Sequence, residues 1–126
     1  MKIVIPVINE NGLDSQLSEH FGRAPYFTVI KLDEKYNIMT QKTESNSGEH
    51  LTGDGHHSSC NHPYRILMFN PDALITYGLG PRALNIFKKA NVVVMKAKSS
   101  TVREVLYEYS NNQLEELTEG CQNSQH

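Results

Sequence analysis

The first apolar run of the chain limits the possible fold more than any other feature. Residues Lys2–Val7 read Lys-Ile-Val-Ile-Pro-Val, so almost every side chain is apolar and most are β-branched. A strand with one solvated face alternates apolar and polar residues, whereas a strand covered on both faces is apolar throughout. We therefore expect this segment at the centre of an α/β sheet.

Local signals predict the remaining elements in turn. Strands are expected at 26–32 and 36–42, joined as an antiparallel hairpin through Asp33-Glu34-Lys35, and again at 72–77 and 92–95. Helices are expected at 64–69, from Pro81 after the turn Gly78-Leu79-Gly80, and from the capping box that Thr101 opens. This order predicts a mixed five-stranded sheet flanked by helices, in which an antiparallel meander is followed by two right-handed crossovers that add parallel strands beside the first strand.

The chain has the size of one domain. Its 126 residues, 38% of them hydrophobic, can bury a single core. We expect one domain over 1–117, with an exposed His-rich loop at 43–61 in which Leu51 is the only aliphatic residue, and a disordered polar tail at 118–126.

Composition argues against several classes of protein. The net charge is −2 and no block of Lys or Arg stands out, so a nucleic-acid partner is not expected. The first apolar run is too short to span a bilayer and lacks the order of a signal peptide. With only Cys60 and Cys121, no disulfide framework is expected, and we predict a cytoplasmic protein.

The segment Gly12–Pro25, which links the first two strands, is the first candidate site. Its small and polar residues predict a structured loop. Within it, His20 is able to bind a metal through a neutral ring nitrogen, and Arg23 to pair with an anion. A lone histidine, however, more often caps or packs a turn.

The turn at 78–82 is the second candidate. Gly78 and Gly80 precede a helix start whose backbone N–H groups attract anions, and Arg82 adds a full positive charge. The same residues also form an ordinary strand-to-helix turn, and they match no phosphate-loop signature.

The third candidate lies within the His-rich loop. His56, His57, Cys60 and His62 place three imidazoles and one thiol within seven positions. Such donors suit zinc, iron, copper and iron–sulfur clusters, but the spacing matches no standard zinc module. A ligand set and a solvated His-rich loop explain this composition equally well.

Position brings the first two candidates together. In the predicted sheet, the first loop and the glycine turn leave the carboxyl ends of adjacent central strands, where open α/β sheets collect their ligands. We therefore expect a binding site at this edge.

Two motifs also resemble a known family. Gly12-Leu13-Asp14-Ser15 with Ser18-Glu19-His20-Phe21-Gly22-Arg23-Ala24-Pro25-Tyr26-Phe27, and later Gly78-Leu79-Gly80-Pro81-Arg82-Ala83-Leu84, are similar to the dinitrogenase iron-molybdenum cofactor biosynthesis family. The resemblance covers residues 1 to about 117. It implies a ribonuclease-H-like three-layer fold and a role in carrying or inserting iron–sulfur or iron–molybdenum clusters.

The resemblance also suggests roles for residues. It makes His20 the expected cluster ligand and places Arg23, Gly78, Gly80 and Arg82 around an anionic guest. The His-laden loop departs from the family pattern, so His56, His57, Cys60 and His62 are either this chain's own ligands or unrelated to the site, and zinc is an alternative metal. Cluster donor and acceptor proteins are the implied partners of a monomer or weak homo-oligomer.

Two other classes of function compete with a carrier. A nuclease would need several carboxylates on the central strands to hold magnesium, and the first strand has none. A metal-independent module that binds an anion or nucleotide at the glycine turn is the stronger rival. No Ser/His/Asp or Cys/His arrangement is evident from the spacing, so we do not expect an enzyme.

Overall fold

The computed structural model describes residues 1–19, 24–45 and 66–117. Its elements are β1 (Lys2–Val7), the 3₁₀ turn η1 (Gly12–Asp14), β2 (Tyr26–Leu32), β3 (Ile38–Ser45), β4 (Ala73–Thr76), α2 (Pro81–Lys89), β5 (Val93–Lys96), α3 (Val102–Ser110) and β6 (Glu115–Glu116). Ile66 and Leu67 are also helical, within the range 64–69 where a short helix is expected, and residues 64 and 65 of that prediction lie outside the described residues. None of the described helices is long and apolar enough to cross a membrane.

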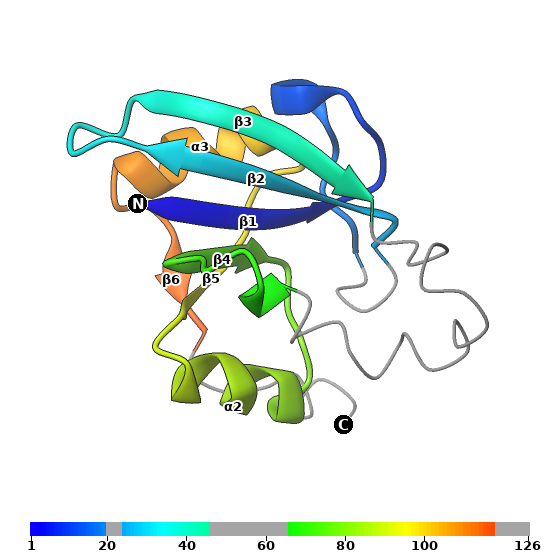
Figure 1. Ribbon diagram of the computed structural model, residues 1–126, viewed down its shortest axis with the longest axis vertical. Coiled ribbons are helices and arrows are strands. Elements are labelled where there is room, and N and C mark those ends of the chain that lie inside the picture. The colour runs from blue at the N-terminus through cyan, green and yellow to red at the C-terminus, as the bar shows by residue number, and fades with distance from the viewer. Residues whose placement is uncertain (20–23, 46–65, 118–126) are drawn as a thin grey trace.

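The strands form one mixed sheet in the order β3-β2-β1-β4-β5-β6 (Figure 1). β1, β2 and β3 are successive antiparallel neighbours, which confirms the predicted meander. β4 lies parallel beside β1 and β5 parallel beside β4, as expected for two added parallel strands. The first strand of the chain is therefore central, and it is the point where the sheet changes from antiparallel to parallel pairing.

The predicted count of five strands is wrong, because β6 adds a sixth. This strand pairs antiparallel with the end of β5, Glu116 opposite Met95 and Glu115 opposite Lys96. Glutamate is uncommon in strands, so two adjacent glutamates do not predict one. The strand is held by its backbone pairing with β5. Leu114 and Leu117 on either side of it pack into the two cores of the domain.

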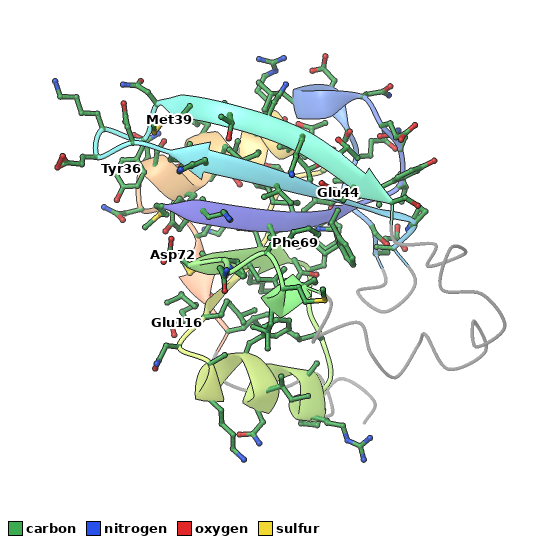
Figure 2. The ribbon with its side chains drawn as sticks, in the orientation of Figure 1. Tyr36, Met39, Glu44, Phe69, Asp72 and Glu116 are labelled. Atoms are coloured by element: carbon green, nitrogen blue, oxygen red, sulfur yellow. The ribbon has the colours of Figure 1, made fainter. Side chains whose placement is uncertain are left out.

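The third strand is also shifted from its predicted range of 36–42. β3 continues to Ser45, so the exposed loop does not begin at residue 43, and the rest of that predicted loop, residues 46–61, lies outside the described residues. The extra residues pair with the start of β2, Ser45 opposite Tyr26. Met39 and Glu44 lie toward opposite ends of this exposed edge strand (Figure 2).

Both faces of β1 are buried, as its composition predicts. Ile3, Ile5 and Val7 point into one core together with Val102, Val105 and Leu106 of α3, here called the α3-side core. Val4 points the other way, into a core that contains Leu84 and Phe87 of α2, here called the α2-side core. The domain therefore has three layers, with a helix packed on each face of the sheet.

Both long helices begin where the sequence predicts. Gly80 is the N-cap of α2 and Pro81 occupies its first turn, where a missing N–H costs nothing. Thr101 caps α3, and its hydroxyl oxygen accepts the Glu104 N–H at 3.3 Å. The same hydroxyl lies 2.9 Å from the Glu104 carboxylate, so the predicted capping pair is formed.

Asp33 organises the turn between β2 and β3. Its Oδ1 accepts hydrogen bonds from the backbone N–H groups of Lys35 at 2.8 Å and Asn37 at 2.9 Å. The bond from Asn37 is the main cause that lowers the pKa of this exposed carboxyl below its usual value. The ionised side chain therefore favours the folded turn.

We expect the turn to loosen in acid. A carboxyl whose pKa is lowered in the folded state stabilises that state above its unfolded pKa, and this contribution disappears as the pH falls through the folded pKa. The Asn37 amide proton should become less protected from exchange over that pH range, as measured by NMR. In an Asp33→Asn variant the protection should not change over the same range, and a wild-type Asn37 amide insensitive to pH would contradict the assignment.

Candidate functional site

The carboxyl ends of β1 and β4 lie side by side at one edge of the sheet (Figure 1). The loop 8–25 leaves β1 at this edge, and the glycine turn leaves β4. The predicted meeting of these two segments at adjacent strand ends is therefore confirmed. Side chains alternate along β4, so consecutive residues at its end point to opposite faces of the sheet.

The loop after β1 is structured, as predicted. Ser15 is fully buried, and its hydroxyl accepts the Asn11 N–H at 2.8 Å and donates to the Asn9 carbonyl at 3.1 Å. The loop then turns back along β1, where the Ser18 N–H donates to the Pro6 carbonyl at 3.0 Å. Backbone hydrogen bonds therefore fix the conformation of this loop as far as Ser18.

The same loop is also tied to the start of α3. The Leu17 N–H donates to the Ser100 carbonyl at 2.8 Å, and the Val102 N–H donates to the Ser15 carbonyl at 3.0 Å. These bonds bring the segment after β5 against the loop after β1. Three carboxyl-end segments, after β1, β4 and β5, therefore meet on the α3 side of the edge.

A pocket of about 460 Å³ lies where these segments meet. Its walls come from the loop after β1, the residue after β4 and the segment before α3, and they are formed by Ile8, Gln16, Leu17, Ser18, Glu19, Pro25, Tyr77 and Ser100. Hydroxyl, amide and carboxylate groups share this lining with aliphatic carbon. A largely apolar lining with a few polar groups is the usual composition of a ligand site.

Tyr77 braces one wall of the pocket. Its hydroxyl donates to the Ser99 carbonyl at 2.8 Å, which links the end of β4 to the segment after β5. Burial, followed by the carboxylates of Glu19 and Glu104, raises the pKa of this phenol above its ordinary value. The side chain therefore stays protonated and keeps its hydrogen bond throughout the neutral range.

The charge of the pocket is negative within the described residues. Glu19 is the one ionisable carboxylate among the lining side chains, and no lysine or arginine accompanies it there. A lone carboxylate with several hydroxyl groups offers hard oxygen donors to a cation or a metal centre. The described walls alone offer no positive charge to an anionic guest.

The glycine turn forms as predicted and leaves the α2 start uncapped. Gly80 has no side chain with which to bind the first helical N–H groups, and no cap hydrogen bond is present. Arg82 is exposed and makes no hydrogen bond or ion pair with the described residues. Gly78, Gly80 and Arg82 therefore lie at the expected edge, and their role in holding an anion stays a prediction.

The predicted metal ligands fall outside the described residues. His20 and Arg23 belong to the segment 20–23, and His56, His57, Cys60 and His62 belong to the segment 46–65. Among the described residues there is no group of three or more His, Cys, Asp or Glu side chains able to hold a metal ion. Every histidine and cysteine of the chain lies outside that part, so the described residues offer carboxylates alone.

Several site residues were missed by the reasoning from sequence. Tyr77, Ser99 and Ser100 follow the carboxyl ends of β4 and β5, and the strand-end rule that selected the glycine turn would have selected them too. Gln16 and Glu19 lie in the predicted loop, but nothing in the local pattern separates lining residues from the rest. Their placement comes from the bonds that tie the loop to α3.

Comparison with known proteins places the whole domain in one group. The model of the family described as dinitrogenase iron-molybdenum cofactor matches residues 1–112. An uncharacterized protein from Methanocaldococcus jannaschii is 26% identical over 117 residues, which cover 93% of this chain and 92% of the relative.

Solved structures share the fold. The apo form of the orange protein from Desulfovibrio gigas is 22% identical, with 94% of this chain and 93% of that chain covered and a TM-score of 0.75. A Thermotoga protein with a provisional NifB name is 27% identical, with 93% of each chain covered and a TM-score of 0.67.

We expect Tyr77→Phe to weaken the pocket wall. The change removes the hydrogen bond from the Tyr77 hydroxyl to the Ser99 carbonyl and leaves that carbonyl without this donor. This loss should lower the free energy of unfolding by about 1 kcal/mol. Urea denaturation of both proteins measures the effect. Tyr107→Phe is the matched control, since this phenol is exposed and makes no hydrogen bond with the described residues, so the loss of its hydroxyl should change the free energy little. Equal effects of the two changes would contradict a bracing role for Tyr77.

Proposed function

Because the chain belongs to the dinitrogenase iron-molybdenum cofactor family, we propose that it binds and carries a metal cluster of the iron–sulfur or iron–molybdenum type. The cluster is cargo, bound for delivery in metallocofactor assembly. The proposal places it at the carboxyl edge of the sheet, in the pocket on the α3 side. Membership of the family supports a role related to this cofactor, and the geometry of the pocket supports the place.

The observation that carries the proposal is the position of the residues that flank the segment 20–23. Ser18 and Glu19, just before His20, and Pro25, two residues after Arg23, all line the pocket. His20 follows Glu19 directly in the chain. Residues on both sides of the segment 20–23 therefore line one pocket, which supports His20 as a ligand of the cargo.

The proposed ligand set consists of nitrogen and sulfur donors. His20 supplies an imidazole, with His56, His57, Cys60 and His62 as a second set of nitrogen and sulfur donors. Imidazole and thiolate suit iron, copper and zinc better than carboxylate oxygens do. Zinc therefore remains an alternative guest, and the choice between zinc and a cluster is left to reconstitution.

The residue types in and around the pocket fit a carrier better than an enzyme. Delivery requires exchangeable ligands and a pocket open to donor and acceptor proteins, and it requires no general base or nucleophile. We accordingly propose a non-enzymatic, cytoplasmic protein, monomeric or weakly associated. A ribonuclease-H-like fold is part of the same proposal. It is supported by the three layers and by β1, which has an antiparallel strand on one side and a parallel strand on the other.

Anaerobic reconstitution tests the proposal directly. Metal-free protein is incubated with iron and sulfide, and separately with zinc or molybdate, and the retained metal is measured by elemental analysis and visible absorption. We expect a coloured, stoichiometric complex with iron and sulfide. His20→Ala should reduce the retained metal by about tenfold or more, because the loss of a ligand costs at least as much as the loss of a supporting residue. His126→Ala, which removes a histidine at the end of the tail, should have no effect.

The remaining variants define the ligand set. A further loss of retained metal in Cys60→Ala would indicate that the His-rich loop belongs to the site. Retention of zinc alone would indicate that the guest is a zinc ion and not a cluster. A protein that retains no metal under any of these conditions would contradict the carrier role.

A further inference from the structure

β3 is an edge strand, and the outer side of its backbone has no partner among the described residues. The strand stands at one end of the sheet and pairs with β2 alone (Figure 1). From Ile38 to Glu44, no backbone group makes a hydrogen bond with a described residue outside that pairing. Such an edge presents a row of free N–H and C=O groups on which another strand can build.

The opposite edge of the sheet is less suited to pairing. β6 has two residues, and both are exposed glutamates. A second copy of that strand would bring carboxylates against carboxylates, which is unfavourable. β3 has eight residues, most of them exposed, and is long enough to form a ladder with another strand.

The lysine in β3 has a neighbouring charge of opposite sign. A lysine on an edge strand commonly prevents pairing with other chains. Here Glu44 follows Lys42 by two residues, so both side chains point to the same face of the sheet. The Lys42 Nζ and the Glu44 Oε2 are 3.1 Å apart, and both side chains are exposed. The edge therefore presents one positive and one negative charge side by side.

This charge pair lies on the face of the sheet away from η1. Lys42 pairs with Val29 and Glu44 with Phe27, and both of these partners belong to the α2-side core. Residues that pair directly across neighbouring strands point to the same face. Leu13 of η1 packs against the α3-side core instead. The loop after β1 therefore does not cover the two charges.

We propose that two copies of this chain associate through β3, as antiparallel strands related by a twofold axis at Thr43. In this register Lys42 lies opposite the partner's Glu44, and symmetry repeats the pair on the other side of the axis. Each carboxylate then lies between two ammonium groups, its own neighbour and the partner's. Thr43 lies opposite the partner's Thr43, a pairing that is favourable between strands. The interface uses the same patch on both copies, as expected for a symmetric dimer.

The charges favour this register over its neighbours. An axis at Lys42 would place the two lysines opposite each other, and an axis at Glu44 would do the same with the two carboxylates. An axis at Gln41 would pair neither charge, since Glu44 would then lie opposite Ile38. Opposite charges stabilise a cross-strand pair and like charges destabilise it. Of these registers, the one centred on Thr43 matches each charge with its complement.

The dimer should be weak and sensitive to salt. One pair of edge strands buries little surface, and interfaces of small area are typical of transient association. Exposed ion pairs contribute little each and are screened by dissolved ions. The association uses neither the pocket on the α3 side nor a bound metal, so the inference is independent of the carrier function.

Sedimentation equilibrium of metal-free protein at low salt tests the proposal. We expect a dimer fraction that rises with protein concentration and falls as salt is added. Lys42→Glu and Glu44→Lys should each weaken dimerisation about tenfold, because two attractive contacts become repulsive. Lys98→Glu makes the same change of charge at an exposed residue outside β3 and should leave the dissociation constant unchanged.

A mixture of two variants tests the register. Lys42→Glu has two negative side chains at this edge and Glu44→Lys has two positive ones, so each variant repels itself and attracts the other. An equimolar mixture should therefore form mixed dimers at least as stable as those of the wild type. Effects within one chain do not explain such a rescue, because each chain keeps its like charges. The double variant Lys42→Glu/Glu44→Lys, which exchanges the charges, should also dimerise like the wild type.

Three results would overturn the proposal. The first is a wild-type protein that stays monomeric up to the concentrations used for NMR. The second is a dimer that neither single variant weakens, since its interface would then lie elsewhere, and the third is a mixture of the two variants that stays monomeric. Circular dichroism of each variant checks that its fold is kept. Because no metal is present, failure of the carrier function does not affect these results.

Discussion

Burial of β1 on both of its faces determines where every other element can lie. Because its side chains enter the α3-side and the α2-side cores alternately, helices must cover both surfaces of the sheet. Its two edges are also used, one by the antiparallel β2 and the other by the parallel β4. A strand buried in this way has its carboxyl end in the middle of one edge, and the loop that leaves it is brought against the turn that leaves β4.

Elements with local signals were predicted well from the sequence. The apolar run of β1, the turn at Asp33 and the caps at Gly80 and Thr101 each depend on neighbours within a few residues, and all of them form. Elements that depend on distant partners were not predicted. The two glutamates of β6 become a strand only because the backbone of β5 offers hydrogen bonds to them.

Tyr36 shows the same limit within a single residue. Tyrosine favours strands, so the sequence suggests that β3 begins there, yet its φ of 66° puts it in the left-handed region. Its ring lies edge-on to the ring of Tyr109 on α3, with 5.9 Å between the centroids. That tertiary contact, which no local pattern reveals, accompanies a backbone conformation that tyrosine rarely adopts. The candidate site has the same limit. The sequence predicted the edge of the sheet at which the site lies, but it did not predict which residues of the three loops line the pocket.

The sheet has two faces at its carboxyl edge, and β4 supplies a polar side chain to each. Thr76 projects to one and Tyr77 to the other, and the order of these two neighbours is set by the register of β4 against β1. Deletion or insertion of a single residue in the four-residue strand β4 would reverse that order, because every side chain beyond the change would move to the opposite surface. The phenol would then face the α2 side of the sheet and the small hydroxyl the pocket. Length variation in β4 is thus a way in which this fold could exchange the polar side chains on the two faces of its sheet without a single substitution.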